Sequence, residues 1–149
     1  MIPKELQPLI RAGQLDSMVQ TPEAVIHEID IAKRHYATAR RSLTVDPEGA
    51  FQLLYDSARK ALQALLAAHG YRVRKPPRGN HYTYVLVART SLVNQEIWLP
   101  LNWMRELRNQ TEYFDPARQS ASEEDCVQAL VHVARMLEDV EFRLLDYLK

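Results

Sequence analysis

Residues 122–148 read SEEDCVQALVHVARMLEDVEFRLLDYL and carry the most regular pattern in the chain. Apolar side chains recur there at steps of four and three residues, which places them on one face of an α-helix. These side chains are Cys126, Leu130, Val133, Leu137, Val140, Leu144 and Leu148. Ser122 to Asp125 resemble a capping box, which marks a helix start. The pattern predicts a long amphipathic helix that packs against other helices.

Two further helices are marked by start signals of the same kind, Thr21-Pro22-Glu23 and Asp46-Pro47-Glu48. Each places a capping side chain before a proline in the first helical turn and an acid beside the positive helix end. Apolar residues follow both signals at helical spacing, from Val25 to Leu43 and from Leu54 to Ala68. The second run stops at His69-Gly70, and glycine commonly ends a helix. We expect these two helices to form an antiparallel pair.

The remaining segments are less regular. Residues 71–80 are rich in Arg, Lys, Pro and Gly and predict a basic loop. Residues 81–92 have strand propensity between Tyr82 and Val87, but we predict a helix because no partner strand is evident. Pro100 restarts or kinks a helix that runs to about Tyr113. The fold class is therefore predicted as all-α, an antiparallel up-and-down bundle of four to five helices over residues 21–149, with residues 1–20 as an arm or short helix.

Composition narrows the classes of function. The 149 residues suit one domain, and 19 basic residues balance 19 acidic ones, so no global charge favours nucleic acid or membrane. Cys126 is the single cysteine, which excludes an internal disulfide and a cysteine-based zinc site. The start of the chain lacks a signal-peptide pattern, and no run of apolar residues is long enough to span a bilayer. We expect a cytoplasmic protein without membrane contact.

The stretch Arg105 to Asp115 concentrates polar chemistry on one side of a predicted helix. Met104 and Leu107 fall on the apolar side. The opposite side carries two guanidinium groups, an amide, a carboxylate and a phenol, from Arg105, Arg108, Asn109, Glu112 and Tyr113. Such a set suits phosphate binding. An alternative is that Arg108 and Glu112, four residues apart, form an exposed ion pair with little energetic weight.

A second set of candidates surrounds the basic loop. Arg72, Arg74, Lys75 and Arg78 are interleaved with Tyr71, Tyr82 and Tyr84, a combination that suits stacking on nucleic acid, although a solvated loop is the commoner meaning. His81 follows Arg78 and could approach the Arg108 face, whereas the other histidines lie on or beside predicted apolar seams. No pattern typical of a metal site, a phosphate-binding glycine loop or a catalytic triad is present. We expect no metal and no cofactor.

Two motifs resemble the HEPN superfamily: DSARKALQALL at residues 56–66 and Arg-Asn-x-x-Glu-Tyr at residues 108–113. The first is mostly a generic amphipathic helix, and the second is more specific to a subgroup of bacterial HEPN-like proteins. The resemblance spans about Val25 to Leu148. It implies a helical bundle that is often dimeric and belongs to toxin-antitoxin, defence or stress systems.

The resemblance also implies a site. In the ribonuclease members an Arg is followed four to six residues later by a His, and paired motifs of two subunits cleave RNA without metal. Arg108 matches that Arg and Asn109 the polar residue beside it. Tyr113 stands where the His is expected, and a phenol holds its proton at neutral pH, so it is a poor general base. The departure favours phosphate or nucleotide binding over cleavage.

Three functions follow from these observations. The first is an HEPN-like protein that binds RNA or a nucleotide. If it is also an enzyme, we expect a ribonuclease toxin in which Arg108 and Tyr113 are catalytic. The further binding residues are Arg105, Asn109, Glu112, Arg78 and His81. The second is a non-catalytic interaction module that pairs with itself or with a nucleotidyltransferase or antitoxin. The third is a plain helical scaffold. We expect a homodimer, because the seam of residues 126–148 and the region of residues 82–103 offer more apolar surface than one small bundle hides.

Overall fold

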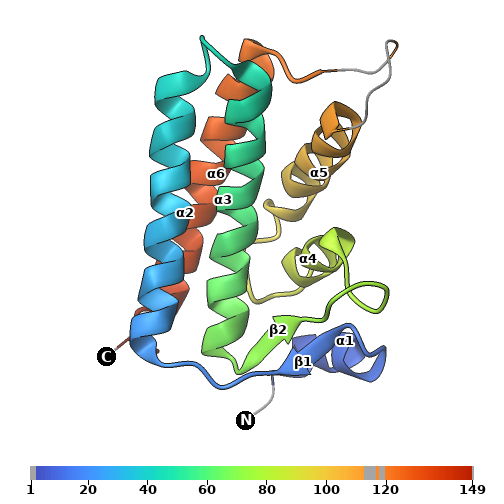
Figure 1. The fold of residues 1–149 in the computed structure, drawn as a ribbon. Coiled ribbons are helices and arrows are strands. Elements are labelled where there is room, and N and C mark those ends of the chain that lie inside the picture. The colour runs from blue at the N-terminus through green and yellow to red at the C-terminus, as the bar shows by residue number, and fades with distance from the viewer. Residues whose placement is uncertain (1–2, 113–116, 118–119, 149) are drawn as a thin grey trace.

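The computed structural model describes residues 3–112, 117 and 120–148, apart from the side chains of Thr111 and Glu112. Figure 1 shows the long helices side by side, with the short elements gathered at one end. In chain order the elements are η1 (Lys4–Leu6), α1 (Gln7–Arg11), β1 (Leu15–Ser17), α2 (Pro22–Ser42), α3 (Pro47–Ala68), β2 (Tyr71–Val73), α4 (His81–Ala88), α5 (Trp98–Glu112) and α6 (Glu123–Leu144). The predicted all-α class is confirmed.

The helix boundaries follow the predicted capping residues. The Thr21 hydroxyl accepts the backbone N–H of Ala24 at the start of α2, and an Asp46 carboxylate oxygen accepts that of Gly49 at the start of α3. Ser122 and Asp125 form the reciprocal capping box of α6. α3 ends just before Gly70, whose φ of 88° lies in the left-handed region that glycine adopts without strain.

The long helices alternate in direction along the chain. In Figure 1, α2 runs upward, α3 downward, α5 upward and α6 downward. α3 lies at the centre and contacts α2, α6, α5 and α4. Its buried residues accordingly lie on several sides of the helix, among them Phe51, Leu54, Tyr55, Ala58, Leu62 and Leu65. Because α3 is central, both α4 and α5 pack against it.

The prediction for residues 81–92 is confirmed in type, since α4 spans His81–Ala88 as a helix. The backbone N–H of Asn80 donates to the Thr83 hydroxyl at 3.2 Å, which fixes the first turn. α5 begins at Trp98, so Pro100 lies in its first turn, where a proline removes no intrahelical hydrogen bond.

The prediction that residues 71–80 are entirely loop is wrong at Tyr71–Val73. This segment is strand β2 and pairs antiparallel with β1, with Leu15 opposite Val73. Asp16 in β1 also forms an ion pair with Arg74 at 2.6 Å. The two strands come from distant parts of the sequence, so neither carries a local hairpin signal.

The predicted division into an arm of residues 1–20 and a domain of residues 21–149 stays a prediction.

A small second core holds these short elements against the bundle. It contains Leu6, Leu9, Leu15, Leu66, Tyr71 and Val87. Because Leu66 lies near the C-terminal end of α3 and Val87 near that of α4, this core joins the β-strands to both helices. Among the described residues, no helix combines the length and apolar character that crossing a bilayer requires.

Candidate functional site

Three arginine–tyrosine contacts lie where α4 and α5 pack against α3. The guanidinium carbon lies 5.8 Å from the ring centre in the pair Arg59–Tyr84, 5.0 Å in Arg105–Tyr82 and 5.7 Å in Arg108–Tyr55. A guanidinium at this distance from an aromatic ring is attracted by the electrons of the ring face. We call these six residues the arginine–tyrosine cluster.

The packing of α5 explains why its arginines reach the cluster. Met104 and Leu107 on α5 are buried in the main core. Arg105 and Arg108 follow each of these residues by one position and therefore lie about 100° further around the helix axis. Both are half-buried rather than exposed, and Arg105 also donates two hydrogen bonds to the Asn102 side-chain oxygen, at 3.0 and 3.2 Å.

Tyr55 is the buried centre of the cluster. It is 0 % exposed, and the His81 ring lies 5.6 Å from its own ring, centre to centre. Burial raises the pKa of the Tyr55 hydroxyl above its usual range, against an opposing effect of Arg59, Arg108 and Arg105. The hydroxyl therefore stays protonated in the field of three guanidinium groups. Within the described part of the chain it has no hydrogen-bond partner.

Arg59 also has a buried donor without a described partner. Its Nη2 donates to an Asp56 carboxylate oxygen at a long 3.4 Å, whereas its Nε is buried and has no partner among the residues described. Gln63 lies one turn along α3, and its side-chain oxygen can accept the Tyr84 hydroxyl at 2.8 Å and Arg59 Nη1 at 2.9 Å. Buried polar groups in folded proteins are nearly always satisfied, so the unused donors of Tyr55 and Arg59 mark positions where a hydrogen-bond acceptor would be stabilised.

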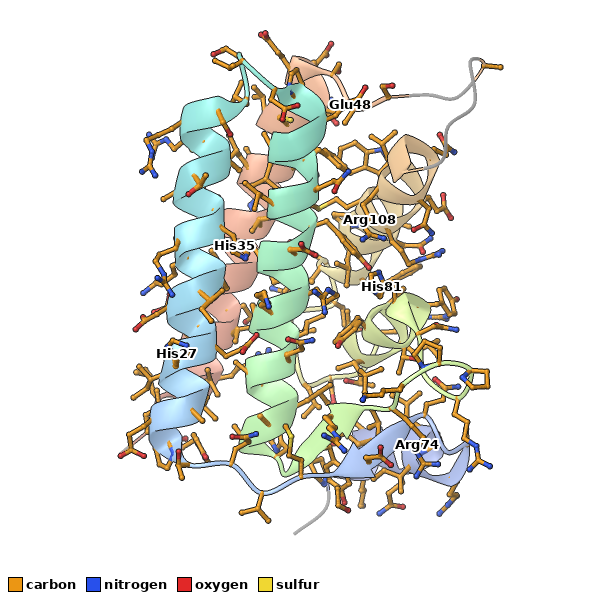
Figure 2. All side chains as sticks on the ribbon, in the orientation of Figure 1. His27, His35, Glu48, Arg74, His81 and Arg108 are labelled. Atoms are coloured by element: carbon orange, nitrogen blue, oxygen red, sulfur yellow. The ribbon has the colours of Figure 1, made fainter. Side chains whose placement is uncertain are left out.

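The structure brings together three of the residues predicted from sequence. Arg105 and Arg108 belong to the cluster, and the His81 ring contacts those of Tyr55 and Tyr84, the latter at 6.4 Å. Figure 2 shows His81 and Arg108 on the same side of α3, between that helix and α4 and α5. Asn109 follows Arg108 on α5 and is half-buried.

Other predicted residues lie apart from the cluster or outside the description. Arg78 is exposed between β2 and α4 and has no hydrogen bond or ion pair with any described residue. Tyr113 and the Glu112 side chain lie outside the described residues. The binding role of Glu112, the alternative of an Arg108–Glu112 ion pair and the role of Tyr113 therefore stay predictions.

Sequence reasoning missed Tyr55 and Arg59. Both belong to α3, a helix buried on several sides, whose sequence reads as a generic amphipathic segment. Their spacing of four residues puts them on one face of the helix. That spacing was the available signal, but it shows neither which helix covers this face nor that the hydroxyl is buried.

The described residues contain no group of three or more His, Cys, Asp or Glu side chains arranged to hold a metal ion. The cluster offers guanidinium and phenol groups, and the imidazole of His81 lies beside them. Guanidinium groups carry no lone pair for a metal and instead match the oxygens of phosphate. The chemistry that this arrangement supports is anion binding.

Comparison with known proteins identifies the family. A family model described as HEPN domain matches residues 15–143, which is most of the chain. Searches of curated proteins and of solved structures found no match. The matched range includes every residue of the arginine–tyrosine cluster and extends from β1 into α6. The chain belongs to the HEPN domain family.

Proposed function

We propose that this protein binds the phosphate of a nucleotide or of RNA in the arginine–tyrosine cluster. The observation that carries the proposal is the Tyr55 hydroxyl, a buried donor without a described partner in the field of three guanidinium groups. A phosphate oxygen accepts hydrogen bonds and carries the negative charge that the three guanidinium groups favour. Membership of the HEPN family supports the same class of ligand.

The residues of the cluster contribute different groups to the proposed binding of phosphate. Arg59 and Arg108 supply charge and directed N–H donors, and Tyr55 adds a neutral O–H donor that burial keeps protonated. Arg105 lies over Tyr82, which is 40 % exposed and therefore accessible to a base that stacks on it. Asn109 and Glu112, the later polar residues of the α5 motif, are proposed as further binding residues. Arg78 attracts the ligand from the neighbouring loop.

Cleavage of RNA would require one further group, an acceptor for the proton of the attacking 2′-hydroxyl. Among the described histidines, His81 is the one whose ring contacts the cluster. We propose metal-independent ribonuclease activity, of the kind that a toxin of a toxin-antitoxin or defence system would have, as the catalytic form of this function. Arg108 would stabilise the charge on phosphate, and Tyr113 would donate a hydrogen bond.

The test combines binding and cleavage. Wild-type protein is titrated into 5′-AMP and into a labelled single-stranded RNA, and RNA integrity is followed with and without a chelator. We expect binding that Arg59→Ala weakens at least tenfold and Arg41→Ala leaves unchanged, since Arg41 is exposed at the end of α2. Chelator-resistant cleavage would support the enzyme, and intact RNA would restrict the function to binding. Equal affinities for wild type and Arg59→Ala would refute the phosphate site.

A second function is self-association or docking of a protein partner on α6. Its outer face exposes three large apolar side chains, Val127 at 54 %, Val131 at 48 % and Phe142 at 72 %, and Leu145, which follows the helix, is 57 % exposed. We propose that this face forms a homodimer or receives an antitoxin or nucleotidyltransferase. A groove between α2 and α6, lined by Tyr36 and Arg40 on one side and Val127 and Val131 on the other, adjoins it.

Light scattering at micromolar protein tests the dimer. Phe142→Glu should yield monomer, and a monomeric wild type would disprove self-association.

A further inference from the structure

A cavity of about 310 Å³ lies between α3, α5, α6 and the segment that joins α4 to α5, and no residue of the arginine–tyrosine cluster lines it. Its volume is in the range of small-molecule sites. Its apolar lining includes six buried residues, Ala58, Ile97, Leu101, Met104, Val133 and Met136. The cavity is open to solvent at its polar rim, so a small molecule can reach the apolar side chains that line it.

The wall of this cavity is held in place by polar contacts. The Asp139 carboxylate accepts the backbone N–H of Asn94 at 2.9 Å and Nε of Arg143 at 3.0 Å. Nη1 of Arg143 donates in turn to the backbone carbonyl of Ser91 at 3.4 Å. These bonds fasten the segment between α4 and α5 onto α6. Specific hydrogen bonds therefore hold this wall of the cavity in place, and the carboxylate of Asp139 is paired with Arg143.

Two other carboxylates at the rim are not used in this way. Glu96 and Glu138 line the cavity, and their side chains have no hydrogen bond or ion pair to any residue that the structure describes. Arg135 contributes one opposing charge. Like Glu96 and Glu138 it is exposed, and like Glu138 it also lines the neighbouring groove between α2 and α6. Burial, followed by the charge of Arg135, lowers the pKa of His132 below its usual value, so this rim residue is neutral at pH 7. The rim is thus acidic on balance.

We propose that this cavity binds a small amphipathic amine, with an aromatic or branched aliphatic body among the apolar side chains and an ammonium group between Glu96 and Glu138. The apolar lining accounts for the body, and the unused carboxylates account for the positive charge. A neutral His132 can accept one of the ammonium hydrogens. This site is separate from phosphate binding in the arginine–tyrosine cluster and does not depend on it.

Methionine methyl groups report directly on the cavity. Met104 and Met136 line it, whereas Met18 lines a different cavity near β2 and serves as an internal control. The ¹³C-methyl spectrum of the protein is recorded during titration with 2-phenylethylamine and with 3-phenylpropionate, an anion of similar size. We expect saturable shifts of the Met104 and Met136 signals with the amine, no shift of Met18, and no comparable response to the anion.

Charge and volume are then varied separately. The double variant Glu96→Gln/Glu138→Gln keeps the shape of the rim and should weaken amine binding at least tenfold, whereas Glu124→Gln, an exposed acid on the same helix as Glu138, should not. Ala58→Leu fills the space from the α3 side and should abolish the response while the Met18 signal keeps its folded position. If Ala58→Leu does not fold, the carboxylate variants decide. Equal responses to amine and anion, or unchanged affinity in the double variant, would overturn the proposal.

Discussion

Arg108 on α5 lies over the ring of Tyr55 on α3, with 5.7 Å between the guanidinium carbon and the ring centre. The contact joins a residue that the sequence marked as a phosphate ligand to one that it did not mark. Tyr55 is fully buried, so the contact also contributes to the packing of α5 on α3. One interaction thus serves both the packing of the helices and the geometry of the proposed site.

Replacement of Arg108 by Ala should separate these two roles. Loss of the contact with Tyr55 should lower the free energy of unfolding by about 1 kcal/mol. Affinity for 5′-AMP or RNA should fall at least tenfold, since a charge-assisted hydrogen bond is removed. Calorimetry and thermal melts measure both quantities. Arg41→Ala is the matched control, and wild-type affinity in the folded Arg108 variant would remove Arg108 from the site.

Tyr55→Phe removes the buried hydroxyl and keeps the ring. Because that hydroxyl has no hydrogen-bond partner in the described structure, its loss should leave the free energy of unfolding unchanged or raise it by up to about 1 kcal/mol. Phosphate binding should weaken if the hydroxyl donates to the ligand. A variant that is as stable as wild type and binds as well would show that Tyr55 only packs.

Tyr113→His tests the motif position at which the ribonuclease members carry histidine. An imidazole there, five residues after Arg108 in the sequence, would exchange protons near neutral pH, so cleavage of labelled RNA should appear or increase. Tyr113→Phe serves as the companion variant, because it removes only the hydroxyl. If both variants match the wild type in binding, cleavage and melting temperature, the position has no part in a site.

Cys126 should resist modification in the folded protein. Burial, with the nearby charges of Asp125, Glu123 and Asp46, raises the pKa of its thiol from 9.0 to about 11. The folded state therefore disfavours the thiolate, and the stability that this confers is complete below pH 9.0 and is lost as the pH rises toward 11. A thiol reagent at pH 8 should label Cys126 only as fast as the protein unfolds. Rapid labelling of the folded protein would contradict the burial of Sγ against the Pro47 carbonyl.

Local signals in the sequence determined the long helices. Thr21, Asp46 and Ser122 cap their helices because a side-chain oxygen meets a backbone N–H three residues away, an interaction contained within one turn. The apolar seam from Cys126 to Leu144 likewise reflects the helical repeat alone. The family resemblance rested on such segments and on the Arg108 motif, and the family match over residues 15–143 confirms it.

The tertiary structure decided what depends on residues distant in the sequence. The pairing of Leu15 with Val73 joins two segments too short to signal strands by themselves. The approach of Arg108 and His81 to Tyr55 depends on how α4 and α5 pack on α3, and helical periodicity shows which residues share a face but not which helix covers it. Burial of the Tyr55 hydroxyl follows from that packing, because a side chain loses water only when another element covers it.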